Sequence, residues 1–178
     1  MPRHAAFLRA VNVGGRRITN VRLADAVTAV GFDHVATFLA SGNIIYDAGG
    51  RDAPTAQHLL ESGLERHLGF ASEVFVRTAE QLDAILDATP FAEDDVAAAA
   101  TKPQIVFLRG PLATADVNAV HQLSSTEDHL RVVGSELHWL PMKGVGRADL
   151  DWRRLDPLIG VNTVRNINTV RRIRPKLD

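Results

Sequence analysis

Phe7-Leu8-Arg9, near the beginning of the chain, recurs as Phe107-Leu108-Arg109 one hundred residues later. Each copy ends an apolar run and opens a loop that contains glycine or proline. Short apolar runs bounded in this way are typical of buried strands. Because a similar order of elements follows each copy, we expect the chain to fold as two related halves.

The elements expected in the two halves follow one order: strand, helix, strand, strand, helix, strand and a last helix. Apolar runs predict the strands, and a capping residue ahead of helical apolar spacing predicts each helix. The first half is expected to have strands over 5–11, 35–39, 43–47 and 73–77, with helices after Asn20, Asp52 and Thr78. The second half is expected to have strands over 104–109, 130–133, 136–140 and 161–164, with helices from Thr114, over 151–159 and after Asn166.

This order is the split βαβ, or ferredoxin-like, pattern. It predicts an α+β fold of two ferredoxin-like subdomains in pseudo-repeat, each an antiparallel sheet with helices on one face. The predicted boundaries are an N-terminal half over 1–90, a linker over 91–102, and a C-terminal half with the terminal helix over 103–178. Within the linker, the acidic triplet Glu93-Asp94-Asp95 favours a solvated segment over a cation site.

The composition is that of an ordinary soluble globular protein, with 46% apolar and 23% charged residues in a chain of 178. The chain has no cysteine, which excludes disulfides, thiolate catalysis and cysteine-ligated zinc. No apolar stretch is long enough to cross a membrane and no signal peptide is recognisable, so we expect a cytoplasmic protein without a membrane partner. The seven histidines lack the spacing of metal ligands and are expected at or near the surface; no metal and no cofactor is predicted.

The charge is unevenly distributed. Twenty basic and twenty-one acidic residues give a net charge of −1, which argues against binding of bulk polyanions. The last eighteen residues nevertheless carry five basic side chains against Asp178. A basic terminal helix is typical of a solvated face or of cations at a helix C-terminus, and we favour this interpretation over a nucleic-acid patch.

The loop from Asn12 to Arg17 is the leading candidate for a binding site. It contains Gly14, Gly15 and Arg16 and leads into a capped helix, so free backbone N–H groups and flanking arginines could hold a phosphate or carboxylate. The alternative is a turn in which Gly14 or Gly15 supplies a positive φ. A second glycine-basic loop over 143–147 ends at Arg147 and would repeat this chemistry.

Several other polar residues lie at strand or helix ends. Arg9, in an apolar run, must be paired, reach water or contact a ligand. Ser41 and Asn43 favour a hairpin turn over a nucleophile, because no motif ties a histidine to Ser41. Arg165 and Asn168 flank Asn166, which is expected to cap the last helix, and both stay open as ligand contacts.

Four ordered motifs resemble the bacterial family catalogued as domain of unknown function 1697. The segments 8–15 and 40–46 are similar to its LRGINVGG and QSGNVVF signatures, and 144–147 and 165–170 are similar to its GxGRSKL and RNWNTV. Ala148-Asp149 stand where the family usually has Ser-Lys, and Ile167 stands where it has Trp. The resemblance implies a two-subdomain α+β fold and no established activity.

The sequence therefore predicts a protein of unknown biochemical function that binds a small anionic ligand between its halves, and it leaves open whether the protein is an enzyme. The alternatives are nucleic-acid binding through the basic C-terminal helix and a non-catalytic homodimer. The residues expected to contact the ligand are Arg9, Asn12, Gly14, Gly15, Arg16, Ser41, Asn43, Arg147, Arg165 and Asn168.

Overall fold

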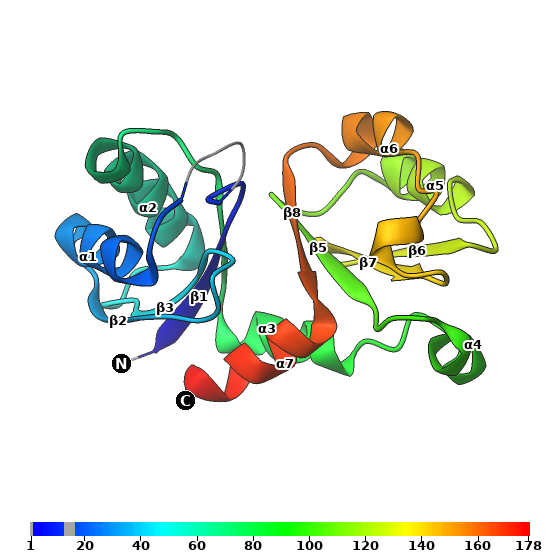
Figure 1. The fold of residues 1–178 in the computed structure, drawn as a ribbon, viewed down its shortest axis with the longest axis horizontal. Coiled ribbons are helices and arrows are strands. Elements are labelled where there is room, and N and C mark those ends of the chain that lie inside the picture. Colours follow the sequence, from blue (N-terminus) through cyan, green and yellow to red (C-terminus); the bar gives the residue numbers. More distant parts are fainter. Residues whose placement is uncertain (1, 13–16) are drawn as a thin grey trace. The chain divides into compact units, whose positions relative to one another are not determined.

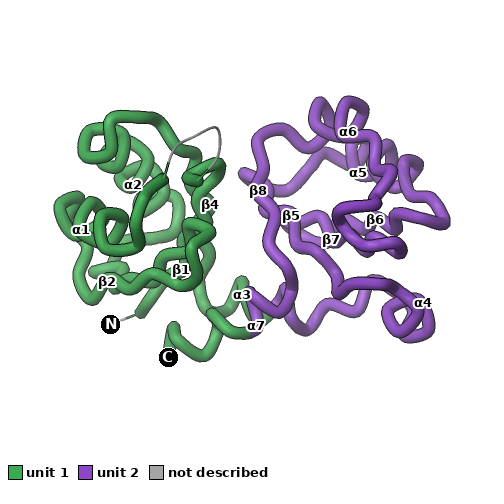
Figure 2. The backbone as a smooth tube through the Cα atoms, viewed as in Figure 1, with its two compact units in different colours: residues 1–83, 172–178 green, residues 84–171 purple. Residues whose placement is uncertain are grey.

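The computed structural model describes residues 2–12 and 17–178, and it divides into two compact units (Figures 1 and 2). Unit 1 consists of residues 1–83 and 172–178, and unit 2 of residues 84–171. Each unit contains one four-stranded sheet in which all neighbouring strands are antiparallel, together with helices. The predicted α+β class is confirmed, whereas the division into 1–90, 91–102 and 103–178 stays a prediction.

Unit 1 has its sheet in the order β2-β3-β1-β4, and α1 and α2 cover one face of it (Figure 1). Buried side chains of β1, β3 and β4 pack there against both helices. The elements are β1 (Arg3–Leu8), α1 (Asn20–Val30), β2 (Asp33–Thr37), β3 (Asn43–Asp47), α2 (Ala53–Leu68), β4 (Val74–Arg77) and α3 (Ala79–Asp87), which continues into unit 2.

Unit 2 has its sheet in the corresponding order β6-β7-β5-β8, with α5 and α6 on one face (Figure 1). Its core includes Trp139, whose ring meets that of Trp152 edge-on at 5.6 Å between centroids. The elements are α4 (Glu93–Ala98), β5 (Gln104–Leu108), α5 (Thr114–Gln122), β6 (Asp128–Val133), β7 (Glu136–Pro141), η1 (Val145–Arg147), α6 (Trp152–Ile159), β8 (Asn162–Asn166) and α7 (Ile167–Ile173), which continues into unit 1 and η2 (Arg174–Lys176).

Most of the predicted helix starts are confirmed by side-chain bonds. Asp52 accepts a hydrogen bond from the backbone N–H of Thr55 at 2.8 Å and so caps α2. Thr78 and Gln81 form the reciprocal capping box at the start of α3. The carboxamide oxygen of Asn166 accepts from the N–H of Asn168 at the start of α7.

Two predicted caps are wrong, and the predicted linker contains a helix. The hydroxyl of Thr19, not the side chain of Asn20, accepts the bond that caps α1. Thr114 already lies inside α5, whose N-cap is Ala113. The linker range contains α4, whose N-cap Ala92 makes no side-chain cap bond. Alanine caps leave no signal in a sequence, which explains the two errors in unit 2.

The two sheets use the same register at matching positions. Ala5 of β1 lies opposite Arg77 of β4, and Ile105 of β5, one hundred residues after Ala5, lies opposite Arg165 of β8. At the ends of the central strands, the N–H of Leu8 donates to the carbonyl of Gly42 and that of Leu108 to the carbonyl of Ser135. No helix among residues 2–12 and 17–178 is long and apolar enough to span a bilayer.

The two helices of unit 1 approach each other most closely at Gly63 of α2. A Cβ atom built on Gly63 would lie 2.3 Å from Cγ2 and 2.8 Å from Cγ1 of Val30, at the end of α1. Val30 is β-branched and has one strongly preferred rotamer in a helix, so it cannot easily move aside. The absence of a side chain at position 63 therefore sets the distance between α1 and α2.

We predict that Gly63→Ala destabilises the protein by about 1–3 kcal/mol, the usual cost of overpacking. Helix propensity alone predicts the opposite sign, a gain of up to about 1 kcal/mol. In a Val30→Ala background the two Cγ atoms are gone and only Cβ of residue 30, 3.1 Å from the added Cβ, remains close, so the same substitution should cost much less. Urea unfolding of the four proteins in this double-mutant cycle measures the difference. Stabilisation by Gly63→Ala alone would refute the packing argument.

Candidate functional site

Four of the predicted contact residues lie at one end of the sheet in unit 1, where the chain leaving β1 meets the β2–β3 turn. They are Arg9, Asn12, Ser41 and Asn43. Asn12 bridges the two: its Nδ2 donates to the carbonyl of Ala40 at 2.8 Å, and its Oδ1 accepts from the N–H of Ile18. The Asn12 side chain thus ties together the two ends of the glycine-arginine loop. Gly14, Gly15 and Arg16 themselves lie outside the described residues.

Ser41 and Asn43 belong to the turn between β2 and β3. Asn43 is fully buried, and its Nδ2 donates to the carbonyl of Phe38 and to the Ser41 hydroxyl. Gly42 between them has a φ of +70°, and a Cβ there would meet Val11 at 2.7 Å. The preferred interpretation of this motif, a hairpin turn that needs glycine, is confirmed.

Arg9 lies just beyond β1 and is exposed. Its guanidinium is 3.6 Å from the carboxylate of Glu73, and its backbone carbonyl accepts from the hydroxyl of Ser72. The requirement that this arginine be paired is met by Glu73 at the surface of unit 1. A half-exposed ion pair of this length contributes little to stability, on the order of 0–1 kcal/mol.

The remaining predicted residues lie in unit 2. Arg147 is exposed at the end of η1, and in the same loop Lys143 contacts Glu127 at 2.7 Å, which raises the pKa of the lysine. Arg165 lies on β8, where burial lowers its pKa to about 10, and it donates to the Thr163 hydroxyl and to the carbonyl of Val164. Asn168, on the first turn of α7, accepts from Nη1 of Arg171 at 2.6 Å.

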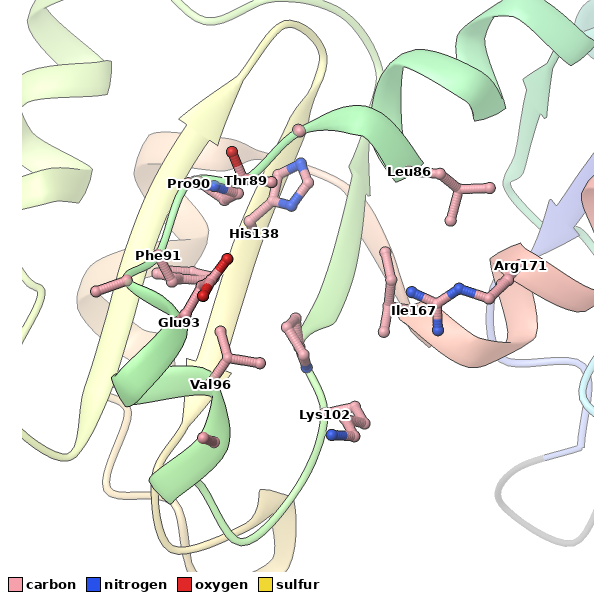
Figure 3. Close-up of a pocket in the computed structure, with 14 residues that line it drawn as sticks. Leu86, Thr89, Pro90, Phe91, Glu93, Val96, Lys102, His138, Ile167 and Arg171 are labelled. Carbon is pink, nitrogen blue, oxygen red and sulfur yellow. The ribbon is translucent and has the colours of Figure 1, made fainter.

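A cavity of about 730 Å³ lies within unit 2, between the end of α3, α4, β7 and the start of α7 (Figure 3). This volume is in the range of small-molecule sites. Its walls are mainly apolar. The apolar lining residues are Leu86, Ala88, Pro90, Phe91, Ala92, Val96, Ala97, Pro103 and Ile167.

The polar groups of this cavity come from different parts of the unit. Lys102 follows α4, Arg171 lies on α7, and Glu93 lies in the first turn of α4. In Figure 3 the guanidinium of Arg171 points toward Ile167, while Glu93 lies on the α4 side of the cavity. Because Asn168 holds the guanidinium of Arg171, a residue expected to contact the ligand instead orients one that lines the cavity.

His138 is the most unusual residue of the lining. It is only 2% exposed, and its Nε2 has no hydrogen-bond partner among the described residues. Burial lowers the pKa of its imidazole to about 4, so the ring is neutral at pH 7. The Nε2 atom has almost no accessible surface, so the ring lies in the wall of the cavity and does not present this atom to a ligand.

The expectation that the histidines lie at or near the surface is wrong for two of them. His138 is in the central part of β7, and His4 in β1 is 5% exposed. Burial also lowers the pKa of His4. Sequence reasoning missed His138, although its place between Leu137 and Trp139 is a signal, since a polar residue inside an apolar run enters the sheet with its neighbours.

The sequence around the other polar residues of the cavity indicated a binding site less clearly. Lys102 and Glu93 belong to the predicted linker, and Arg171 was considered only as part of a basic helix. Among residues 2–12 and 17–178, no cluster of three or more His, Asp or Glu side chains could hold a metal. The cavity can therefore be described by two cationic groups, one carboxylate and one neutral imidazole over apolar walls.

The fold and this cavity define a class of protein: a two-unit α+β chain with a ligand-sized cavity in its second unit. The chain belongs to the family described as Protein of unknown function (DUF1697), whose model matches residues 1–138. The resemblance inferred from the motifs is thus confirmed, and its two C-terminal motifs lie beyond the matched residues. The biochemical function of the family is unknown.

A solved structure supports the fold over the whole chain. The conserved bacterial protein SP0830 from Streptococcus pneumoniae is similar with a TM-score of 0.78 and 22% identity, over 99% of this chain and 98% of that protein. At this identity the likeness is one of fold alone. No curated protein matches the chain.

Because His138 is neutral in the folded protein, we predict that acid destabilises unit 2 through it. The unfolded chain takes up a proton near pH 6.5 and the folded chain only near pH 4, so stability falls as the pH drops through this window. The loss should reach about 3 kcal/mol from this residue. Chemical unfolding measures the free energy of unfolding at pH 7 and at pH 4. The fall between the two should be smaller by about 3 kcal/mol in His138→Leu, and the exposed control His67→Gln should keep the wild-type profile. Parallel profiles for wild type and His138→Leu would contradict the prediction.

Proposed function

We propose that the protein binds a small anionic ligand in the cavity of unit 2. The observation that carries the proposal is the pair of cations, Lys102 and Arg171, at a cavity of about 730 Å³ whose other walls are mainly apolar. Guanidinium and ammonium groups bind carboxylates and phosphates by charge-assisted hydrogen bonds. Both cations are solvent-exposed, so each such bond contributes modestly, on the order of 1 kcal/mol.

The positions of the two cations support this proposal. Arg171 is held at its Nη1 by the neutral oxygen of Asn168, so its charge is not cancelled by that contact. The next residue, Arg172, lies over the ring of Phe38 at 4.9 Å, and Arg174 is paired with Asp83 and Asp178. Arg171 is thus the member of the basic C-terminal cluster that the geometry assigns to the cavity.

The other sequence predictions keep their status. The two glycine-basic loops, over 12–17 with Arg16 and over 143–147 with Arg147, stay a prediction together with Arg9, as does a ligand between the halves. Nucleic-acid binding through the basic helix, a homodimer and a cytoplasmic location in a bacterium also stay predictions. The contacts of Arg172 and Arg174 give nucleic-acid binding no support, because both side chains already pack or pair within unit 1.

We also propose that the two units are copies of one ferredoxin-like unit. The equal strand orders and the matching register of Ala5–Arg77 and Ile105–Arg165 support this. The unit boundaries, after Asp83 in α3 and after Arg171 in α7, each fall six residues beyond those edge-strand arginines. Unrelated units have no reason to share these positions.

Titration calorimetry of the full chain tests the proposed binding. Inorganic phosphate, glucose 6-phosphate, adenosine monophosphate and octanoate serve as probes, and we expect heat of binding from at least one. Lys102→Gln combined with Arg171→Gln should weaken that binding by about fivefold or more, the equivalent of one ion pair of about 1 kcal/mol. The matched control, Lys143→Gln with Arg172→Gln, removes the same charge outside the cavity.

Two results would contradict the proposal: no heat from any probe, or equal binding by the cavity variant and the control. If Arg147→Gln lost binding while the cavity variant kept it, the ligand would bind at the glycine-basic loops and not in the cavity.

A further inference from the structure

We propose that the ligand of the unit 2 cavity is a monocarboxylate with an apolar body, such as a medium-chain carboxylic acid. This inference rests on the proposed function and names the chemical class that fits the same cavity. Three features carry it: the charge of the lining, the chemistry of the walls and a buried neutral side chain. Each restricts the ligand in a different way.

The charge of the lining matches a single negative charge. Lys102 and Arg171 supply two positive charges and Glu93 supplies one negative charge, so the cavity has an excess of one cation. A monoanion balances this excess, whereas a phosphate monoester, close to doubly charged at pH 7, leaves a surplus negative charge near Glu93. All three charged side chains are exposed, so they lie at the mouth of the cavity, where a carboxylate can meet the cations while its hydrocarbon body contacts the apolar walls.

The walls favour hydrocarbon over hydroxylated groups. Nine of the fourteen lining residues are apolar, among them Leu86, Phe91 and Val96. A sugar or nucleoside placed against them would bury hydroxyl groups without hydrogen-bond partners. A hydrocarbon chain gains free energy there, equivalent to about fourfold in affinity for each methylene group removed from water.

His138 adds a neutral ring to the wall of the cavity. The residue is only 2% exposed, and its Nε2 has almost no accessible surface. Because the imidazole stays neutral at pH 7, it does not add a third cation that would call for a dianion.

Ile167 limits the size of the body that fits. It is 8% exposed, it lines the cavity, and its backbone N–H donates to the carbonyl of Pro103 at 2.9 Å. The motif that residues 165–170 resemble has a tryptophan at this position. A larger side chain at this position would project into the volume that Ile167 lines, so the space for an apolar chain depends on this residue.

A homologous series of ligands gives the most direct test. We expect hexanoate, heptanoate and octanoate to bind with affinities that rise about fourfold for each added methylene. Acetate, 1-octanol and octylamine should bind far more weakly, because each lacks either the chain or the negative charge. Calorimetry with the full chain at pH 7.5 measures all six.

Matched variants locate the two ends of the ligand. Arg171→Gln should weaken octanoate binding by about fivefold or more, and Arg172→Gln should leave it unchanged. Glu93→Gln removes a repulsive charge and should leave binding equal or tighter. Ile167→Trp should abolish most of the binding while Ile167→Val retains it, and circular dichroism confirms that both variants fold.

The outcomes separate this inference from the proposed function. Binding of glucose 6-phosphate or phosphate that is sensitive to Lys102→Gln and Arg171→Gln, with no binding of octanoate, overturns the carboxylate class and leaves anion binding in place. Tighter binding of 2-aminooctanoate than of octanoate, lost in Glu93→Gln, replaces the monocarboxylate with a zwitterion. A flat affinity across the chain-length series overturns the apolar body. Absence of binding by any anion overturns both proposals.

Discussion

The central strands β1 and β5 have no face open to water, and this constrains the rest of each unit. Ala5 to Leu8 and Ile105 to Leu108 are each at most 1% exposed. Their backbone N–H and carbonyl groups must find partners in the protein, because an unpaired buried group costs as much as a lost hydrogen bond. Each strand is therefore paired on both sides, by β3 and β4 in unit 1 and by β7 and β8 in unit 2. The two recurring apolar segments thus fix the middle of both sheets.

Each edge strand has a neighbouring strand on one side only. On the other side, side chains supply some of the hydrogen-bond partners that a strand would supply. The N–H groups of Val74 and Val76 in β4 donate to the side chains of Glu61 and Gln57 in α2. At one edge of the sheet in unit 2, the N–H of Val132 in β6 donates to Nε2 of His121 in α5. Three edge strands also carry an arginine whose Nη1 donates to the carbonyl of the preceding residue, namely Arg77, Arg131 and Arg165. Such edges are less available for pairing with another chain.

The fold could be predicted from the sequence because its signals are local, whereas the cavity could not because its residues are scattered. Apolar runs and capping residues such as Asp52 and Thr78 gave the order of elements. Errors arose where two adjacent residues can both cap, as at Thr19 and Asn20, or where the cap is alanine, as at Ala92. The cavity joins α4, whose N-cap is alanine although its first turn is acidic, to β7 and α7, which are distant in the chain. The glycine-arginine motif indicated a binding site in the loop that begins at Asn12. The side chain of Asn12 makes hydrogen bonds to the backbone of Ala40 and Ile18.

The repeat that we propose for the two units does not extend to the charges at corresponding positions of α3 and α7. Arg171 follows Arg165 by six residues on α7, and the residue that follows Arg77 by the same distance on α3 is Asp83. Asp83 accepts hydrogen bonds from Nε and Nη2 of Arg174, which lower the pKa of its carboxyl, so its charge serves to attach the C-terminal segment within unit 1. At the same place in the second unit, the sequence has a cation that Asn168 orients and that lines a cavity. In the repeat that we propose, corresponding positions thus carry an ion pair of the fold in one unit and a cation of the proposed site in the other.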